Sequence, residues 1–135
     1  MTIPFQGGCS CGAVRYECNS EPHITFFCHC LDCQKNTGAP FSVDVIVPVD
    51  SVKITGELKG YKTTTDSNDE VTRKFCSECG TPVLNQPHSF PEIIALKVSS
   101  IDDPSWVQPQ AHLWTMRKQP WLKLNDDLPQ YERNM

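Results

Sequence analysis

The chain has 135 residues, of which 39% are hydrophobic and 21% charged, and its formal net charge is −4 at pH 7. This balance is typical of a globular domain and excludes a disordered chain. An acidic chain has no basic surface for a phosphate backbone, so we expect no nucleic-acid partner. No apolar run is long enough to cross a membrane, and residues 1–5 show no secretory signal. We therefore expect a cytoplasmic protein with no membrane partner.

In chain order, short segments in which apolar and polar residues alternate predict a series of strands. We expect strands at 13–18, 24–27, 41–49, 52–55, 58–62, 71–75, 83–85 and 93–98, with a hairpin turn over 66–70. Helical structure is expected only as short turns at 34–38, closed by Gly38, and at 125–131. The predicted fold class is therefore mainly β, with residues 1–135 forming one domain.

The eight cysteines are the most informative residues. Seven of them fall into three tight groups: Cys9 and Cys11; Cys28, Cys30 and Cys33; and Cys76 and Cys79. Cytoplasmic cysteines stay reduced, and disulfide frameworks usually spread their cysteines to close long loops. Close C-x-C and C-x-x-C spacing instead indicates metal binding.

The outer two pairs predict a closed zinc site made of Cys9, Cys11, Cys76 and Cys79. In an extended segment, residues two apart project to the same side, so Cys9 and Cys11 can face a common centre. A zinc with four thiolates is saturated, and this one would link the N-terminal segment to the middle of the chain. We expect it to be structural.

The middle group predicts a second zinc with three sulfurs and one open position, as in a catalytic site. An open zinc can bind an incoming thiol as thiolate or polarise a carbonyl oxygen, and a soft donor set favours a sulfur guest. We therefore expect Cys28, Cys30 and Cys33 to be catalytic and the substrate to be a thiol. Two alternatives remain open: Cys18 is a fourth ligand or a small buried hydrophobe, and His29 is a ligand or lines the pocket.

Three stretches with their spaced thiols carry a resemblance to a known family. They are GCSCGAVRY at 8–16, CHCLDCQKNTG at 28–38 and FCSECGT at 75–81, together with HLW at 112–114, PW at 120–121 and LP at 128–129. With these motifs the chain resembles the glutathione-dependent formaldehyde-activating enzymes and the centromere-protein-V-like zinc domains. The resemblance covers nearly the whole chain.

This resemblance implies small stacked sheets pinned by the four-cysteine zinc site, a fold shared with a Rab-binding zinc chaperone and with B-type methionine sulfoxide reductases. It implies two zincs per chain, the structural one and a catalytic one at the three-cysteine site that is displaceable when glutathione binds. The implied activity is that of a carbon–sulfur lyase, which forms or cleaves S-hydroxymethylglutathione from glutathione and formaldehyde. The expected partner is glutathione or one of its adducts.

Several other side chains are candidates for roles at the catalytic zinc. His29 or Asp32 is the candidate for moving the proton, since each lies beside metal ligands in the sequence. Lys35 and Arg15 are candidates for binding the glutathione carboxylates. Phe41 and Trp114 are candidates for the pocket wall, although core packing is the simpler expectation for Phe41.

Three interpretations compete with a lyase. The main alternative is a non-catalytic, zinc-stabilised binding or chaperone module of the same fold, which predicts four protein ligands on both metals or a three-cysteine site without metal, and an exposed apolar patch. A nucleic-acid-binding zinc ribbon is disfavoured by the acidic charge. A methionine sulfoxide reductase would have Cys18 as its remaining free thiol.

Overall fold

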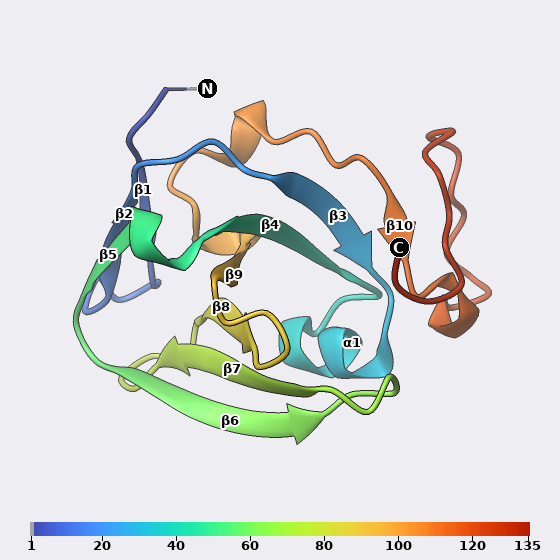
Figure 1. The fold of residues 1–135 in the computed structure, drawn as a ribbon, viewed down its shortest axis with the longest axis horizontal. Helices are drawn as coiled ribbons and strands as arrows, with labels where there is room; N and C mark the ends of the chain where they lie inside the picture. Colours follow the sequence, from blue (N-terminus) through green and yellow to red (C-terminus); the bar gives the residue numbers. More distant parts are fainter. Residues whose placement is uncertain (1) are drawn as a thin grey trace.

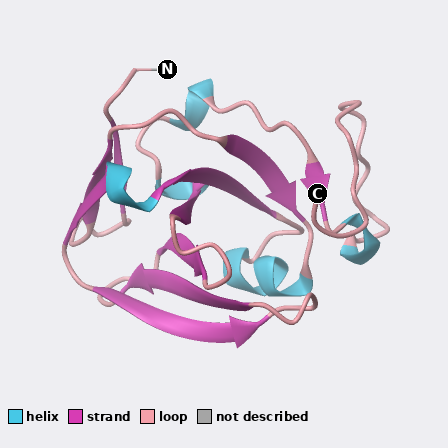
Figure 2. Cartoon of the chain, in the orientation of Figure 1, coloured by secondary structure: helices cyan, strands magenta, loops and turns pink. Residues whose placement is uncertain are grey.

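The computed structural model describes residues 2–135, and strands make up most of their regular structure (Figures 1 and 2). The strands are β1 (Phe5–Gly8), β2 (Arg15–Cys18), β3 (Ile24–Cys28), β4 (Ser42–Pro48), β5 (Val52–Thr55), β6 (Leu58–Thr64), β7 (Glu70–Cys76), β8 (Pro82–Pro87), β9 (Ile93–Lys97) and β10 (His112–Leu113). The helical elements are α1 (Leu31–Thr37) and the 3-10 turns η1 (Val49–Ser51), η2 (Val98–Ser100), η3 (Pro104–Trp106) and η4 (Thr115–Arg117). This confirms the mainly β fold class.

The strands form two sheets. The smaller has the order β1-β2-β5, and the larger has the order β10-β3-β4-β9-β8-β7-β6. Neighbouring strands are antiparallel except β10, which runs parallel to β3. Figure 1 shows that the larger sheet curls around α1, which lies between β4 above and β7 below.

The main core lies between the two sheets. Alternate residues of β4 and β9 contribute Val45, Val47, Ile94 and Leu96, and the smaller sheet contributes Phe5 and Tyr16 to the same buried cluster. The Tyr16 hydroxyl lies 2.7 Å from the Ser100 hydroxyl, which adds a polar link across the core. Since successive strand residues point to opposite faces, the other face of the larger sheet is left for α1 and its surroundings.

The first helix differs from the prediction. It begins at Leu31 rather than after Cys33, so Cys33 lies in its first turn. The Cys30 sulfur accepts the backbone N–H of Cys33 at 3.2 Å and so takes the place of the usual oxygen cap, which explains why the sequence pattern did not indicate this start. The end is as predicted: Gly38 has a φ of 69° and its N–H donates to the Gln34 carbonyl at 2.9 Å.

The predicted helical turn at 125–131 is wrong. This segment is irregular, and its end lies beside β10, where the Tyr131 N–H donates to the His112 carbonyl at 2.8 Å. In return, the His112 N–H donates to the Pro129 carbonyl at 2.9 Å. Pairing with β10 therefore satisfies the backbone, and Pro129 disfavours a helical conformation at the residue before it. Strand β10 itself was not predicted, because two residues give no periodic signal.

Candidate metal centres

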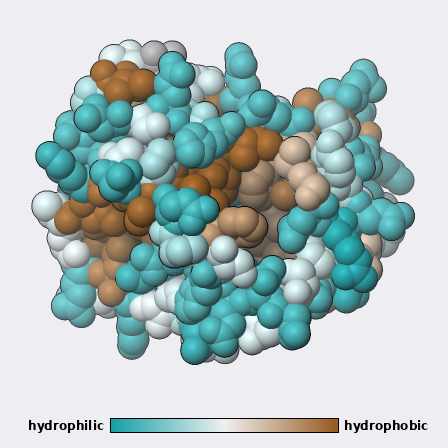
Figure 3. Space-filling view, in the orientation of Figure 1, coloured by the Kyte–Doolittle hydropathy of each residue, from teal (hydrophilic) through white to brown (hydrophobic). Residues whose placement is uncertain are grey.

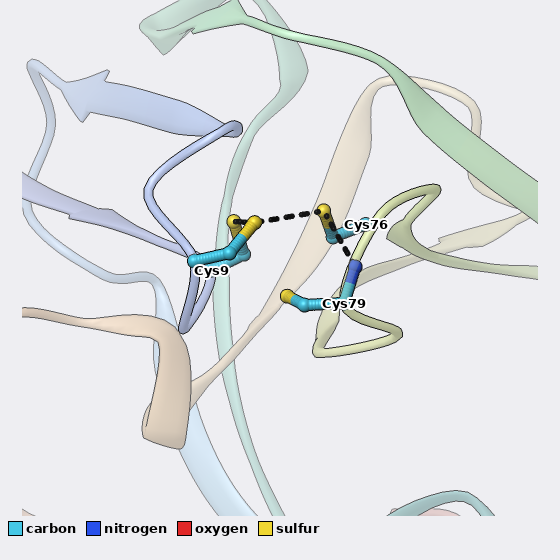
Figure 4. A group of neighbouring side chains, drawn as sticks. Cys9, Cys76 and Cys79 are labelled. Atoms are coloured by element: carbon cyan, nitrogen blue, oxygen red, sulfur yellow. Dashed lines mark hydrogen bonds between the residues drawn. The ribbon is translucent and has the colours of Figure 1, made fainter.

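The four cysteines of the predicted structural site converge. Their sulfurs all lie within 4.8 Å of one another, with 3.6 Å between Cys9 and Cys11 and 3.8 Å between Cys11 and Cys76. Four sulfurs about 2.3 Å from a tetrahedral zinc are about 3.8 Å apart, so spacing and donor type both fit zinc. Figure 4 shows Cys9 reaching from the N-terminal turn toward Cys76, the last residue of β7, and Cys79, which lies in the turn after this strand.

Three of these sulfurs, those of Cys9, Cys76 and Cys79, have hydrogen-bonding neighbours that favour negative charge. The Val14 N–H donates to the Cys9 sulfur at 3.2 Å, and this bond is the main reason that the pKa of Cys9 lies below its usual value. The Cys79 N–H lies 3.4 Å from the Cys76 sulfur. The Thr81 hydroxyl, 3.1 Å from the Cys79 sulfur, lowers the pKa of Cys79 to about 5. Thiolates are the form that a metal binds.

One detail of this site corrects the prediction. Cys9 and Cys11 do not lie in an extended segment, because β1 ends at Gly8 and residues 10–12 form a tight turn. The Gly12 N–H donates to the Cys9 carbonyl at 3.3 Å, and Gly12 has a φ of 83°, a conformation that glycine adopts readily. The turn, rather than strand alternation, brings the two sulfurs together.

The three cysteines of the predicted open site also converge, with their sulfurs within 4.8 Å of one another. Cys28 ends β3, Cys30 caps α1 and Cys33 lies in the first turn of that helix. Cys28 and Cys33 are 7% and 3% exposed, whereas Cys30 is half-buried and forms the exposed edge of the cluster. Three convergent soft donors fit zinc with one further position to fill.

Cys18 and His29 lie outside this group of sulfurs. Cys18 is fully buried, with its sulfur 3.6 Å from the Ser20 carbonyl oxygen and from the Ser51 hydroxyl, as expected for a small buried residue. His29 is also fully buried, and its Nε2 lies 2.9 Å from Nδ1 of His112. Among the described residues, neither adds a fourth ligand to the three sulfurs.

The imidazoles of His29 and His112 belong to a hydrogen-bonded chain that ends at a carboxylate. Nε2 of His112 lies 2.8 Å from Oδ2 of Asp126, so this nitrogen carries the proton and donates a hydrogen bond to the carboxylate. Nδ1 of a neutral His112 is then an acceptor, and His29 donates to it through Nε2. This leaves Nδ1 of His29 unprotonated, buried and, within residues 2–135, without a hydrogen-bond partner. Burial lowers the pKa of His29 to about 4, in keeping with a neutral ring.

Sequence reasoning missed His112 and Asp126 as members of this chain. A signal for His112 was present, because it stands between Ala111 and Leu113 in an apolar run where a polar residue has to be hydrogen-bonded. The sequence contained no such signal for Asp126, because a residue in an exposed loop gives no indication of a buried partner.

Buried charges near Cys33 were missed as well. Hydrogen bonds with Cys28 and Cys30 hold the pKa of Cys33 well below its usual value, and the positive charges of Lys97 and Arg73 act in the same direction. Nη1 of Arg73 is 3.9 Å from the Cys33 sulfur. A lysine at the end of the apolar segment 93–98 was a usable signal for a buried charge.

Two other candidates, Arg15 and Trp114, are each held by hydrogen bonds within the chain. Arg15 donates to the Asp102 carboxylate through Nη1, at 2.9 Å, and through Nη2, so a ligand carboxylate would have to compete with Asp102. Trp114 is 5% exposed, packs in the same cluster as Cys28 and Cys33, and donates from Nε1 to Asn134 at 2.8 Å.

The remaining candidates are Phe41, which lies among aromatic rings, and Asp32 and Lys35, which belong to helix α1. The Phe41 ring centroid lies 5.0 Å from that of Phe27 and 5.7 Å from that of His29. Asp32 is half-buried on α1, and Lys35 is exposed on the same helix. Phe41 thus takes part in an aromatic group next to the cysteines, as expected for either core or wall.

Two cavities lie beside α1 and beside β8 and β9. One, of about 420 Å³, is lined by Leu31, Gln34, Lys35, Gly38, Ala39, Pro40, Gln119 and Trp121, and the other, of about 380 Å³, lies beside β8 and β9. Neither cavity is lined by a cysteine. Figure 3 shows a hollow with apolar side chains near the centre of the face where β4 and α1 lie in Figure 1.

The chain is similar to proteins of one known family. Residues 4–117 match the family model described as "Glutathione-dependent formaldehyde-activating enzyme". The chain belongs to this family. A relative from Phaeosphaeria nodorum is 30% identical over 115 residues, which cover 78% of this chain and 60% of the relative. A relative from Halomonas elongata is 28% identical over 127 residues, which cover 89% of this chain and 80% of the relative.

Both relatives carry the provisional name of glutathione-dependent formaldehyde-activating enzyme. The chain spans about 60% of the length of the Phaeosphaeria nodorum and Colletotrichum graminicola family members that it matches. A crystal structure of a Rhodobacter sphaeroides protein has the same fold, with a TM-score of 0.58 at 23% identity, covering 77% of this chain and 91% of that one. Within the described residues, no helix is both long and apolar enough to span a bilayer.

Proposed function

We propose that this family member is a zinc-dependent carbon–sulfur lyase that acts on a thiol adduct of a small carbonyl compound, such as S-hydroxymethylglutathione. The observation that carries the proposal is the convergence of Cys28, Cys30 and Cys33 on one point with a half-buried edge at Cys30. Three thiols without a fourth ligand among the grouped side chains match an open zinc site. The reaction is assigned to the cytoplasm, where the eight free thiols stay reduced.

Two zincs per chain are part of the proposal. The four-cysteine group holds the structural ion, and Cys28, Cys30 and Cys33 hold the ion at the reaction site. When bound there, zinc supplies Lewis acidity and lowers the pKa of an incoming thiol. The protein contributes the fixed positions of the sulfurs, because Cys30 caps α1 while Cys33 and the end of β3 are packed against Trp114.

Formation of the adduct moves one proton from sulfur to oxygen as the C–S bond forms and the carbonyl becomes a hydroxyl group. Nδ1 of His29 is the candidate to take this proton from the thiol and return it to the oxygen, because it is the unprotonated end of the Asp126–His112–His29 chain. Cleavage of the adduct reverses both transfers. General acid–base groups of this kind typically contribute about 10²–10⁴-fold in rate.

A second candidate function has an observation in its favour. Cys28 and Cys33 are almost completely buried, and the two cavities lie elsewhere, with exposed Leu31 and Trp121 beside α1. A non-catalytic binding or chaperone module of the same fold would have these properties. It requires no turnover, and its three-cysteine site would be indifferent to glutathione.

The test follows interconversion of glutathione, formaldehyde and S-hydroxymethylglutathione by NMR exchange, with zinc counted per chain. We expect the wild type to accelerate the exchange and Cys30→Ser to lose both this activity and one zinc. Cys18→Ser, a matched change outside both sulfur groups, should keep both. Wild-type exchange no faster than the uncatalysed reaction, or a Cys30→Ser variant that retains activity and both zincs, would overturn the proposal.

A further inference from the structure

We propose that four buried polar residues form a counter-charge network for the three-cysteine site, so that the site retains a divalent ion as a three-thiolate complex. The network residues are Arg73, Asn85, Lys97 and Asp44. The inference rests on the proposed function in one respect, the presence of a metal at this site. It adds that Arg73 and Lys97 are positioning residues, which act on the metal through Cys33.

The network crosses four neighbouring strands on one face of the larger sheet. Arg73 on β7 is paired in register with Asn85 on β8, and Lys97 on β9 with Asp44 on β4. All four are between 2% and 6% exposed. Strand alternation places Asp44 on the opposite face from Val45, which belongs to the main core, so the network faces away from that core.

Each network residue contacts the next. Lys97 Nζ donates to Asp44 Oδ1 at 3.2 Å, and the Ser42 hydroxyl donates to the same oxygen at 3.1 Å. With the Asn85 amide oriented to satisfy its neighbours, its oxygen accepts from Lys97 Nζ at 3.1 Å and from Arg73 Nη1 at 3.2 Å. Arg73 Nη1 also lies 3.9 Å from the Cys33 sulfur. The network therefore ends at a metal-site sulfur.

The charges of the network do not balance by themselves. Burial raises the pKa of Asp44, whereas the Lys97 ammonium and the Ser42 hydroxyl act in the opposite direction. We count Asp44 and Lys97 as an ion pair because their charged atoms lie 3.2 Å apart. Two cations and one anion leave one excess positive charge within the network, which is costly in a buried position unless an anion lies nearby. The Cys33 and Cys30 sulfurs act on Arg73 in this way, and the half-buried Asp32 carboxylate on α1 adds to them. Arg73 is the member closest to an anion source, and its buried Nε has no hydrogen-bond partner in residues 2–135.

A divalent ion bound by three thiolates supplies the missing charge. The complex of a divalent ion with three thiolates has a net charge of −1, which balances the net charge of +1 on the network. A monovalent ion with three thiolates would carry two negative charges, and three neutral thiols would carry none. The network thus favours the divalent complex over both alternatives, which gives an electrostatic reason for the buried charged residues behind Cys33.

The experiment removes zinc from the loaded protein with increasing chelator and counts the zincs remaining per chain by native mass spectrometry. We expect Arg73→Met to release its first zinc at a chelator strength roughly 10- to 100-fold lower than the wild type. Arg73→Lys keeps the charge and should stay within a few-fold of the wild type. Lys62→Met, a control at an exposed salt bridge with Glu70, should not change either zinc.

The sign of the charge provides the decisive comparison. Asp44→Asn makes the network more positive and should retain the first zinc at least as well as the wild type. The Arg73→Met/Asp44→Asn double variant, whose total charge balances again, should recover most of the loss caused by Arg73→Met. If Arg73→Met fails to fold, Arg73→Gln takes its place, because it removes the charge but keeps a polar side chain within the network, and it should show the same loss of retention.

Three results would overturn the inference: unchanged retention in a folded Arg73→Met, a loss in Arg73→Lys as large as in Arg73→Met, or a loss of 10-fold or more in Asp44→Asn. These failures are separate from failure of the proposed function. Charge-dependent retention without any exchange activity would contradict the lyase alone. Exchange activity with charge-independent retention would contradict the network alone.

Discussion

Nε2 of His29 and Nδ1 of His112 lie 2.9 Å apart in the interior, and the carboxylate of Asp126 determines which of the two carries the proton. Because a carboxylate only accepts, it fixes the tautomer of His112, and His112 in turn fixes that of His29. The exposed loop at Asp126 thereby controls the protonation of the buried ring of His29, the residue between Cys28 and Cys30 in the sequence.

The first prediction concerns this control. Asp126→Asn puts an amide in place of the carboxylate, and an amide can donate as well as accept, so both tautomers of His112 become available. We expect long-range proton–nitrogen NMR to show a single Nε2–H tautomer of His29 in the wild type and a mixture in the variant. Exchange activity should fall about 10-fold at unchanged zinc content.

Asp127→Asn is the matched control for this prediction. Asp127 neighbours Asp126 and has a φ of 60°, a conformation that asparagine tolerates. The control should keep both the tautomer and the activity. An unchanged His29 signal in Asp126→Asn would show that the carboxylate does not set the tautomer.

The second prediction concerns pH. The hydrogen bond from His112 holds the pKa of Asp126 below its usual value of about 3.9. A carboxyl whose pKa is depressed in the folded state contributes stability that is fully present above its unfolded pKa and is lost as pH falls through the folded pKa. Plots of unfolding free energy against pH for the wild type and Asp126→Asn should therefore be parallel above about pH 5 and converge in stronger acid. A gap that stays constant down to the acid limit would refute this linkage.

The third prediction separates the two metal groups. Cys76→Ala opens the four-cysteine site, and a structural zinc of the kind proposed there contributes on the order of 10 kcal/mol in comparable small domains, about as much as the whole stability of a domain. We expect this variant to lack a cooperative thermal transition. Cys33→Ala should unfold cooperatively with one zinc per chain, because its cluster does not connect the two sheets. Equal damage from both substitutions would argue against the division into structural and reactive sites.

The fourth prediction concerns a close backbone approach. Gly56 has a φ of 95°, and a Cβ there would lie 2.0 Å from the Ala13 carbonyl oxygen. Gly38 has a φ of 69°, and a Cβ there would have no neighbour within 4 Å. In chemical denaturation, Gly38→Ala should cost roughly 1–2 kcal/mol. Gly56→Ala should cost at least twice as much, since it adds a clash with the backbone to the same conformational strain. Similar costs would mean that the β5–β6 turn moves away freely.

Local patterns were sufficient for much of this fold. Alternation in segments such as 41–49 and 71–75 placed the strands correctly, and the hairpin at 66–70 followed from its turn residues. The spacing of the cysteines also divided them into the two groups that the structure brings together. Most of these signals come from residues that are close together in the sequence.

What could not be predicted depends on partners far apart in sequence. His29 meets His112 only because β10 pairs with β3, and β10 is too short to be recognised. Arg73 meets Cys33 only because α1 lies on the face of the sheet that carries the network. The end of the segment 125–131 pairs with β10, and Pro129 reinforces this non-helical conformation. In each case tertiary pairing, which no local pattern contains, determines the outcome.

The central claim is that the three-cysteine site holds a zinc that accepts a thiol from outside the protein. Zinc-edge X-ray absorption of the two-zinc protein, with and without glutathione, tests it most directly. We predict that the sulfurs bound by the two zincs together increase from the seven of the two cysteine groups to eight when glutathione is added. Eight sulfurs before the addition, or seven unchanged after it with both zincs retained, would contradict the claim.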